Sequence, residues 1–186
     1  MAKVAILLAD GFETVEALAP ADVLRRGGQD VSLVTINKTP RVTSGHKITI
    51  EADATIDTYD FSDCDLVVLP GGMPGTTNLR ANERVCELAR KFVADKKLGA
   101  ICAAPSILAE LGLLEGRTAT CYPGCEGAFP ADVRPEALGT YTDGNLVTAS
   151  GPAYAIDFGL ALLRSLAGEA EADRVANGML ETSRTE

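Results

Sequence analysis

Four stretches of the chain are almost continuously apolar and stop at small or polar residues. They are KVAILLA (3–9), DVSLVTI (30–36), DLVVLPGG (65–72), which runs into a Gly-Gly turn, and LGAIC (98–102). Uninterrupted apolar runs of this length are typical of strands that are buried on both faces, as in parallel sheets. The pattern therefore predicts a central, largely parallel sheet.

Between and after these runs, apolar residues recur at helical spacing, and several of the segments end at glycine. The predicted helices are 13–26, 82–95, 105–114, 152–167 and 169–180. Strands that alternate with helices over short connections favour an open α/β sandwich with right-handed crossovers. No repeat or linker interrupts the pattern, so we expect one domain over residues 1–186.

Three shorter segments complete the predicted elements. Residues 41–51 alternate apolar and polar side chains and predict a short hairpin outside the main sheet. RTATCY (117–122) predicts a further short strand. Residues 139–150 place an Asp143-Gly144 turn between two β-like runs, which is a strong hairpin signal.

Composition narrows the classes of partner. The 186 residues include 17 basic and 26 acidic side chains, a net charge of −9, which argues against nucleic acid or anionic lipid as a partner. No apolar run approaches the roughly 20 residues of a membrane helix, and the N-terminus lacks a secretory leader pattern. We therefore expect a cytoplasmic protein that acts on a small neutral or polar molecule.

The five cysteines are too few and too scattered for a disulfide scaffold, so we expect thiols. Cys121 and Cys125 lack a second pair at metal-ligand spacing, and His46 is the chain's single histidine. We predict no metal site, and the chemistry inferred below requires no cofactor.

In α/β folds of this kind, ligands bind beyond the carboxyl ends of the strands. One of the loops selected by this rule contains Cys102, which ends a predicted strand and precedes a helix that begins with Pro105. Small neighbours on both sides permit the sharp turn of a nucleophile elbow, and a helix N-terminus lowers the pKa of a nearby thiol. The alternative is an inert cysteine of the core.

Two further features fall at the same edge of the predicted sheet. Gly71 and Gly72 follow a strand, where glycine lets backbone N–H groups approach a ligand, although a plain tight turn would look the same. Glu16 lies in the otherwise apolar segment TVEALAP, which slightly favours a buried carboxyl over a solvated one. Burial would raise the pKa of that carboxyl and let it share a proton with a thiolate.

A Cys-His hydrolase would need a histidine close to the nucleophile, and the sequence offers none nearby. His46 would have to reach the site from the predicted hairpin or from a second subunit. A solvated surface histidine is the simpler interpretation.

Five segments together resemble the ThiJ/PfpI superfamily, and specifically its ThiJ-like, deglycase-like branch. The match spans nearly the whole chain and agrees in order, spacing and context. The segments are LADGFETVEALAPADVLRRGG, DLVVLPGGMPGTTNL, GAICAAPSILAELGLL, ATCYPG and VTASGPAYAIDFGLALLRSLAG.

The resemblance implies a flavodoxin-like, three-layer α/β sandwich that usually forms a homodimer. It implies that Cys102 is the reactive cysteine, and that Glu16 is its protonated partner, which hydrogen-bonds the sulfur and stabilises the thiolate. It also implies an oxyanion or substrate pocket formed by the backbone amides of Gly71, Gly72 and Ala103.

The chain departs from the family pattern at two loops. Tyr122 stands where some members carry a histidine beside the cysteine, which disfavours the protease-like branch. The loop SGPAY, which contains Pro152, replaces a frequent RGPGT and changes the pocket's shape and charge. His46 falls near the position from which related proteins bring an arginine of the partner subunit, and Cys121 is a candidate resolving thiol or a small apolar filler.

These observations leave three functional hypotheses. The first is a cofactor-independent enzyme of glyoxalase or deglycase type, in which Cys102 adds to a small α-oxoaldehyde such as methylglyoxal and Glu16 serves as acid and base. The second is a redox-sensing or chaperone-like protein that uses oxidation of Cys102. The third and weakest is a cysteine amidase or peptidase.

Overall fold

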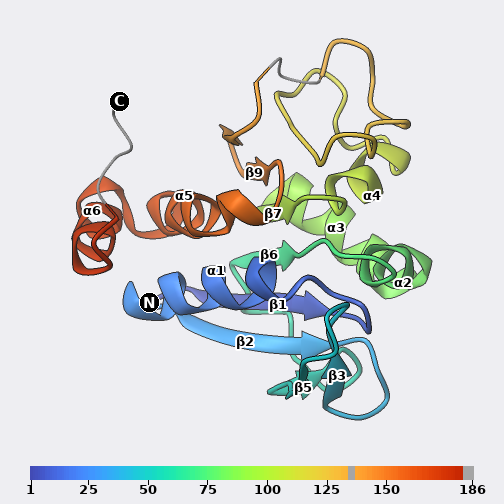
Figure 1. The fold of residues 1–186 in the computed structure, drawn as a ribbon, viewed down its shortest axis with the longest axis horizontal. Coiled ribbons are helices and arrows are strands. Elements are labelled where there is room, and N and C mark those ends of the chain that lie inside the picture. Colours follow the sequence, from blue (N-terminus) through green and yellow to red (C-terminus); the bar gives the residue numbers. More distant parts are fainter. Residues whose placement is uncertain (134–136, 182–186) are drawn as a thin grey trace.

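The computed structural model describes residues 1–133 and 137–181 and is built around a mostly parallel sheet (Figure 1). Within the described residues the sheet has seven strands in the order β5-β2-β1-β6-β7-β9-β8, with β8 antiparallel to its neighbour. The strands are β1 Lys3–Leu8, β2 Asp30–Thr35, β5 Ala54–Thr55, β6 Leu66–Leu69, β7 Lys97–Ile101, β8 Thr140–Asp143 and β9 Leu146–Ala149. The predicted α/β class, with a largely parallel sheet, is confirmed.

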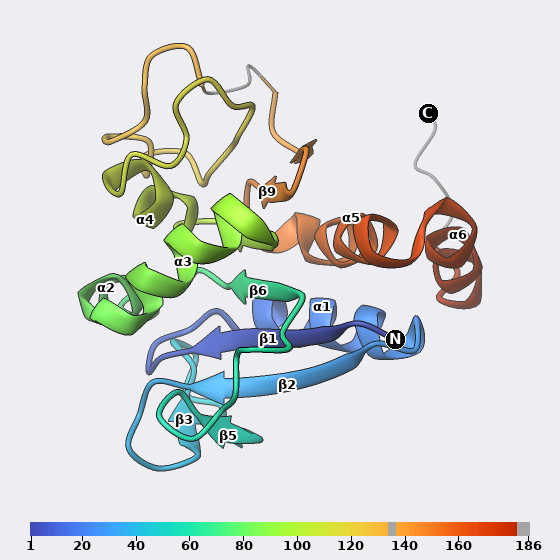
Figure 2. The same cartoon turned by 180° about the vertical axis from the view of Figure 1, so that it is seen from behind.

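Helices cover both faces of the sheet (Figures 1 and 2). They are α1 Thr14–Arg26, α2 Gly75–Ala81, α3 Glu83–Asp95, α4 Pro105–Glu110, the 3₁₀ turn η1 Pro152–Tyr154, α5 Ala155–Ala167 and α6 Glu169–Gly178. Alternate residues of β1 divide between two apolar cores. Ile6 packs in the core that contains α1 and α5 residues, and Leu7 in the core that contains α3 and α4 residues. Because helices pack on both faces of the sheet, its central strands need apolar side chains on both faces, and this agrees with the continuous apolar runs in the sequence.

A second, two-stranded sheet lies outside the central one, as the alternating pattern predicted. It pairs β3 Arg41–Thr43 with β4 Thr49–Glu51 in antiparallel register. The tip of this hairpin docks on the loop after β1, where Gly45 N–H donates to the Phe12 carbonyl at 2.9 Å. The hairpin is thereby fixed beside the carboxyl end of the sheet.

The predicted strand at 117–122 is wrong. This segment forms no strand, because its N–H groups have acceptors outside a strand ladder. Thr120 N–H donates to the Thr148 hydroxyl, and Tyr122 N–H donates to the Cys102 carbonyl. The segment is therefore held by a side chain of β9 and by the Cys102 carbonyl rather than by the backbone ladder of a strand.

Other predicted boundaries also shift. The helix expected at 105–114 ends at Glu110, and Gly112 then adopts a φ of +69°, which stops the helix. The short elements α2 and β5 were not predicted. No helix within the described part of the chain is long and apolar enough to cross a membrane.

Candidate active site

Cys102 occupies a strained turn between β7 and α4. Its φ of +63° lies in the left-handed region, where a side chain other than glycine is uncommon. Two hydrogen bonds hold this turn: Cys102 N–H donates to the Ala149 carbonyl, and its own carbonyl accepts from Tyr122 N–H, both at 2.8 Å. The predicted elbow is confirmed, and because such strain clusters at functional sites the geometry favours a role in chemistry over one as core filler.

Glu16 brings a buried carboxyl to the same place from the first turns of α1. It is 0% exposed, and its Oε2 accepts from Gly71 N–H at 2.9 Å. Its Oε1 has no hydrogen-bond partner among the described residues. The buried interpretation of Glu16 is therefore confirmed, with one oxygen anchored and one left for the thiol or a ligand.

Gly71 lets these two groups approach one another. A Cβ placed on Gly71 would lie 2.7 Å from Cys102 Cβ and 2.7 Å from Glu16 Oε2. Both distances are far shorter than a van der Waals contact. Any side chain at this position would therefore push the thiol and the carboxyl apart.

The thiol and the carboxyl affect each other's protonation. Burial raises the pKa of Glu16 to about 7, against the smaller opposing effects of hydrogen bonds from Cys102 and Gly71. Burial also raises the pKa of the Cys102 thiol, and an ionised Glu16 raises it further. The pair thus favours holding a proton near neutral pH.

Two sequence-based expectations need correction here. The helix N-terminus was expected to lower the pKa of Cys102, but α4 spans only six residues and burial outweighs its effect. The Gly71 amide was expected in an oxyanion hole, but its N–H is already bonded to Glu16. Gly71 instead positions the carboxyl.

The other two predicted amides do face the sulfur. Hydrogen bonds from the N–H groups of Gly72 and Ala103 favour the Cys102 thiolate and lower its pKa, in opposition to burial. Gly72 has a φ of +89°, and a Cβ there would lie 2.3 Å from the Glu13 nitrogen. This close approach explains the need for glycine in the loop after β6.

Two predicted pocket residues lie in segments beside the elbow: Tyr122 N–H bonds to the Cys102 carbonyl, and Pro152 follows Ala149, which accepts from Cys102 N–H. The Tyr122 ring is half exposed, with a carbon 3.1 Å from the position that a Gly151 Cβ would take. Pro152 is exposed at the start of η1 in the same loop. Tyr122 therefore covers the loop beside the cysteine, in the region where some family members carry histidine.

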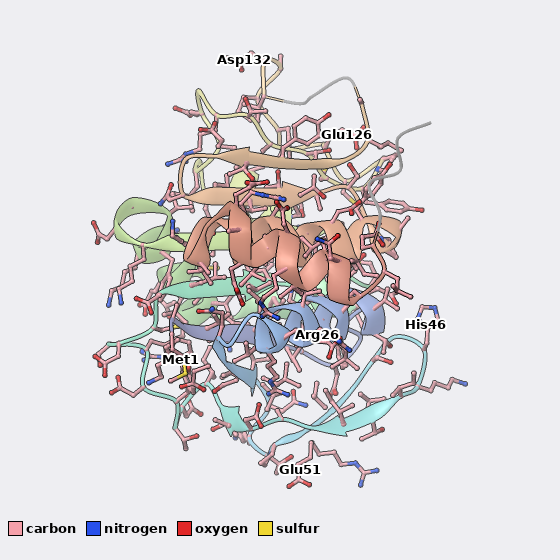
Figure 3. All side chains as sticks on the ribbon, turned by 90° about the vertical axis from the view of Figure 1, so that its left-hand side faces the viewer. Met1, Arg26, His46, Glu51, Glu126 and Asp132 are labelled. Atoms are coloured by element: carbon pink, nitrogen blue, oxygen red, sulfur yellow. The ribbon has the colours of Figure 1, made fainter. Side chains whose placement is uncertain are left out.

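His46 lies apart from the thiol. Its side chain is 72% exposed, and Nδ1 is 3.5 Å from Glu13 Oε2. Figure 3 shows it at the edge of the molecule. No Cys-His dyad is formed within the described chain, since this histidine is the chain's only one.

The sequence analysis did not predict a set of buried hydroxyl groups that hydrogen-bond to one another in the segments next to the elbow. Thr120 Oγ1 and Ser150 Oγ are 3.0 Å apart, and the Ser150 hydroxyl also accepts from Gly139 N–H. Thr148 accepts from Thr120 N–H. The available signal was the pair of hydroxyl residues within the otherwise apolar run LVTAS, which a fully buried strand tolerates only when they are hydrogen-bonded.

The described cysteines form no disulfide, and the described residues include no group of three side chains arranged to hold a metal ion. The groups that the described structure brings to Cys102 are the Glu16 carboxyl and the backbone N–H groups of Gly72 and Ala103.

Comparison with known proteins identifies the family. The model of the DJ-1/PfpI family matches residues 2–165. The chain belongs to this family. The resemblance drawn from the sequence motifs is thereby confirmed, together with the flavodoxin-like fold.

Relatives match along most of the chain. Protein dj-1beta of Drosophila melanogaster is 34% identical over 94% of this chain and 95% of its own length. Deglycase PH1704 of Pyrococcus horikoshii is 33% identical over 81% of this chain and 91% of its own length. The chain spans less than half the length of two Arabidopsis thaliana relatives, DJ-1 homologs B and A, covering 41% and 46% of them.

Solved structures agree with the fold throughout. Oxidized DJ-1 of Toxoplasma gondii superposes with a TM-score of 0.92 at 32% identity, covering 97% of this chain and 98% of that one. A DJ-1 superfamily protein of Salmonella typhimurium, solved as a cysteine-to-alanine mutant, gives a TM-score of 0.91 at 37% identity, covering 98% and 100%. Proteins of this family are commonly dimeric.

Proposed function

We propose that this protein is a cofactor-independent enzyme that uses Cys102 to convert small α-oxoaldehydes, such as methylglyoxal or its early adducts on thiols and amines, to hydroxy acids. The observation that carries the proposal is a strained cysteine that shares its pocket with a fully buried carboxyl whose pKa is about 7. Relatives from Pyrococcus horikoshii and Pyrococcus abyssi that are named deglycases support it.

The first step is formation of the thiolate. From the state in which Glu16 is ionised, a proton moves from Cys102 Sγ to the carboxylate, against the raised pKa of the thiol, and the neutral carboxylic acid then donates a hydrogen bond back to the sulfur. The unpartnered Oε1 is free to carry that proton, since Oε2 is anchored by Gly71. The N–H groups of Gly72 and Ala103 add two donors to the thiolate.

The second step is addition to the aldehyde. The Sγ lone pair forms a C–S bond to the aldehyde carbon, and the C=O π electrons move to its oxygen, which takes the proton from Glu16. The product is a hemithioacetal on Cys102. An adduct on a small thiol enters the same path by releasing its carrier thiol as the aldehyde carbon passes to Sγ.

The remaining steps are an internal oxidation and reduction followed by hydrolysis. The ionised Glu16 takes the proton from the aldehyde-derived carbon and returns a proton to the former ketone carbon through an enediol. The first carbon becomes a thioester, and the second becomes a carbinol. Water then cleaves the thioester, so that methylglyoxal and water yield lactate and the free Cys102 thiol.

The setting of this activity is part of the proposal. We propose a cytoplasmic homodimer active in defence against carbonyl or oxidative stress. The family is commonly dimeric, which supports the oligomeric part. His46, whose Nδ1 lies 3.5 Å from Glu13 Oε2, falls near the position from which related proteins bring an arginine across a dimer.

A second function is favoured by the donors around the sulfur. The Gly72 and Ala103 N–H groups would stabilise a sulfinate on Cys102 as readily as an alkoxide, and the Toxoplasma gondii relative was solved in an oxidized form. A redox-sensing or chaperone-like role through oxidation by peroxide is therefore the alternative. The amidase or peptidase hypothesis loses support because His46 pairs with Glu13, away from the thiol.

Turnover of methylglyoxal to lactate tests the proposal. We expect wild-type protein to form lactate, Cys102→Ser to fall to the protein-free background, and Glu16→Gln to lose about a hundredfold or more in kcat. Circular dichroism would establish that the variants are folded. Absence of turnover in wild type, together with clean conversion of Cys102 to the sulfinate by mild peroxide, would overturn the enzyme proposal in favour of the sensor.

A further inference from the structure

The peptide that joins Cys102 to Ala103 is trans and planar, so its oxygen and its hydrogen point in opposite directions. The oxygen is the Cys102 carbonyl, which accepts from Tyr122 N–H at 2.8 Å. The hydrogen is on Ala103 and bonds to the Cys102 sulfur, where it favours the thiolate. The bond from Tyr122 therefore fixes the direction of an N–H group that acts on the sulfur.

Tyr122 ends a segment that no strand ladder holds in place. Within this segment, Thr120 N–H donates to the Thr148 hydroxyl at 3.0 Å. Thr120 Oγ1 also lies 3.0 Å from Ser150 Oγ, within hydrogen-bond distance. These two bonds attach the segment to the end of β9, only two residues before Tyr122.

The same end of β9 binds the other side of the elbow. Ala149 lies between Thr148 and Ser150, and its carbonyl accepts from Cys102 N–H at 2.8 Å. The Cys102 backbone is thus held at its N–H by β9 and at its carbonyl by a segment tied to β9. A φ of +63° is costly for a cysteine, and such a conformation persists only where its surroundings over-determine it.

The hydroxyl groups of this network are buried. Thr120 and Ser150 are each 2% exposed, and Thr148 is 0% exposed. The Ser150 hydroxyl is fixed in turn, because it accepts from Gly139 N–H at 3.0 Å and donates to the Gly139 carbonyl at 3.2 Å. A buried network whose members are hydrogen-bonded makes its surroundings rigid.

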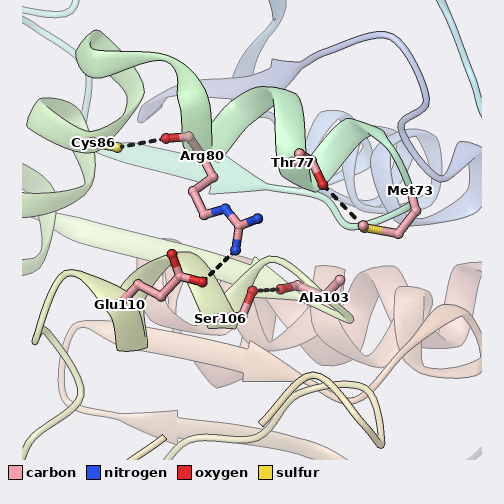
Figure 4. A network of polar contacts seen from close by, with 7 residues as sticks. All are labelled: Met73, Thr77, Arg80, Cys86, Ala103, Ser106 and Glu110. Atoms are coloured by element: carbon pink, nitrogen blue, oxygen red, sulfur yellow. Dashed lines mark hydrogen bonds and ion pairs between the residues drawn. The ribbon is translucent and has the colours of Figure 1, made fainter. Parts of the chain in front are cut away.

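The next carbonyl of the elbow is held separately, from α4. The Ser106 hydroxyl donates to the Ala103 carbonyl at 2.7 Å (Figure 4), and Ser106 N–H donates to the same oxygen at 3.1 Å. This contact is local, within three residues. It leaves the direction of Ala103 N–H to be set through the Cys102 carbonyl.

We propose that three hydroxyl residues, Thr120, Thr148 and Ser150, are positioning residues for the reactive cysteine. They hold Tyr122 N–H against the Cys102 carbonyl, and this bond aims the N–H group of the following residue at the sulfur. Hydrogen bonds in a chain polarise one another, so the bond to the carbonyl also makes that N–H group a stronger donor. The inference rests on the proposed function only where the same N–H group binds the alkoxide of the aldehyde.

Alkylation of Cys102 by iodoacetamide, followed by mass spectrometry of the peptide that contains it, tests the inference without turnover. Thr120→Val removes the hydroxyl that meets Ser150 and keeps the shape of the side chain. Thr148→Val removes the acceptor of Thr120 N–H. We expect the rate constant at pH 7 to fall about three- to tenfold in each variant, and the pH profile to shift upward, because a hydrogen bond to the thiolate is weakened. Thr120→Ser and Thr148→Ser keep the oxygen and should restore the wild-type profile.

Thr35→Val is the matched control for Thr148→Val. Thr35 is 0% exposed, and its hydroxyl accepts from Asn37 N–H at 3.1 Å at the end of β2. This variant should lose similar stability in urea and keep the wild-type alkylation rate. None of these exchanges changes a charge, so the effect of Glu16 on the thiol is retained. Repeating the series in a Glu16→Gln background follows the thiol alone, because the two groups otherwise titrate as a pair.

Turnover separates this inference from the proposed function. With methylglyoxal, we expect Thr120→Val to lower kcat about tenfold and to leave KM within about twofold, because the N–H group acts on the developing alkoxide. Wild-type alkylation rates in folded Thr120→Val and Thr148→Val would overturn the inference, even if methylglyoxal is converted. Slower alkylation in these variants, without any conversion by wild type, would overturn the proposed function and leave the positioning role supported. If Thr148→Val does not fold, Thr120→Val decides alone, since it leaves every backbone N–H group of the network with its acceptor.

Discussion

At the scale of single residues, the protonation of Glu16 has a measurable consequence for stability. Its pKa is 4.5 in an unperturbed chain and about 7 in the folded protein, so between these values the native state binds more protons than the unfolded state. The free energy of unfolding therefore falls as pH rises through this window, by about 3 kcal/mol for a shift of this size. The contribution is fully present below about pH 4.5 and lost above about pH 7.

Glu16→Gln should remove this pH dependence, because glutamine keeps an acceptor for Gly71 N–H and does not titrate. Urea unfolding at pH 5 and pH 8 measures the difference between the two free energies. We expect the variant to show a smaller decrease than wild type over this interval. An identical decrease in both proteins would assign the pH dependence to other groups.

Gly71→Ala should impair activity more than folding. The added methyl would lie 2.7 Å from Cys102 Cβ and from Glu16 Oε2, which forces the two groups apart. Because displacements of about 1 Å in a reacting constellation cost roughly a hundredfold, we expect a loss of that order in kcat/KM for methylglyoxal. Gly178→Ala, whose added methyl meets nothing within 4 Å, is the control and should leave the rate unchanged.

At the scale of elements, α1 carries Glu16 and is held against α5 by a close contact at Gly159. A Cβ on Gly159 would lie 3.0 Å from Pro20 Cα and 3.0 Å from Val23 Cβ, both in α1. Gly159→Val must separate the helices, so we expect about 1–3 kcal/mol of destabilisation in thermal or urea unfolding. Ala167→Val, on an exposed position of α5, should cost only a few tenths of a kcal/mol.

Elements with a strong apolar pattern were predictable from the sequence, and those fixed by tertiary contacts were not. The runs that became β1, β2, β6 and β7 are apolar on both faces because helices cover both faces. The segment 117–122 has β propensity, but its N–H groups bond to the Thr148 hydroxyl and the Cys102 carbonyl rather than to the backbone of a neighbouring strand. Its conformation depends on partners distant in sequence, which no local pattern reveals.

The candidate site shows the same division. The elbow at Cys102 followed from small neighbours and Pro105, which are local signals. The direction in which the pKa of the Cys102 thiol shifts could not be predicted in this way. Burial and the charge of Glu16 raise that pKa, they arise only in the assembled fold, and they outweigh the lowering effect of a short helix. The anchoring of Glu16 by Gly71 likewise joins residues 55 positions apart.

At the scale of the whole molecule, exposed apolar side chains gather at one end of the α1 and α5 pair. Gly159 of α5 lies against Pro20 and Val23 of α1, and Gly27 lies against Leu163, so the two helices run in the same direction. Their first turns therefore lie at the same end of the pair. Val15 and Ile156, in these first turns, are 46% and 36% exposed.

We expect these two side chains to lie in the interface of the proposed homodimer, next to the helix turn that carries Glu16. Val15→Asp combined with Ile156→Asp should shift the protein from about twice its 19.4 kDa mass to the monomer, measured by light scattering after size-exclusion chromatography. An acidic residue in the first turn of a helix is favourable, so the double variant should stay folded. Leu180→Asp, at a position 87% exposed, is the control and should remain dimeric. A monomeric wild type would contradict the homodimer, whereas a dimeric double variant would place its interface elsewhere, because two buried aspartates facing their symmetry mates would be strongly repulsive.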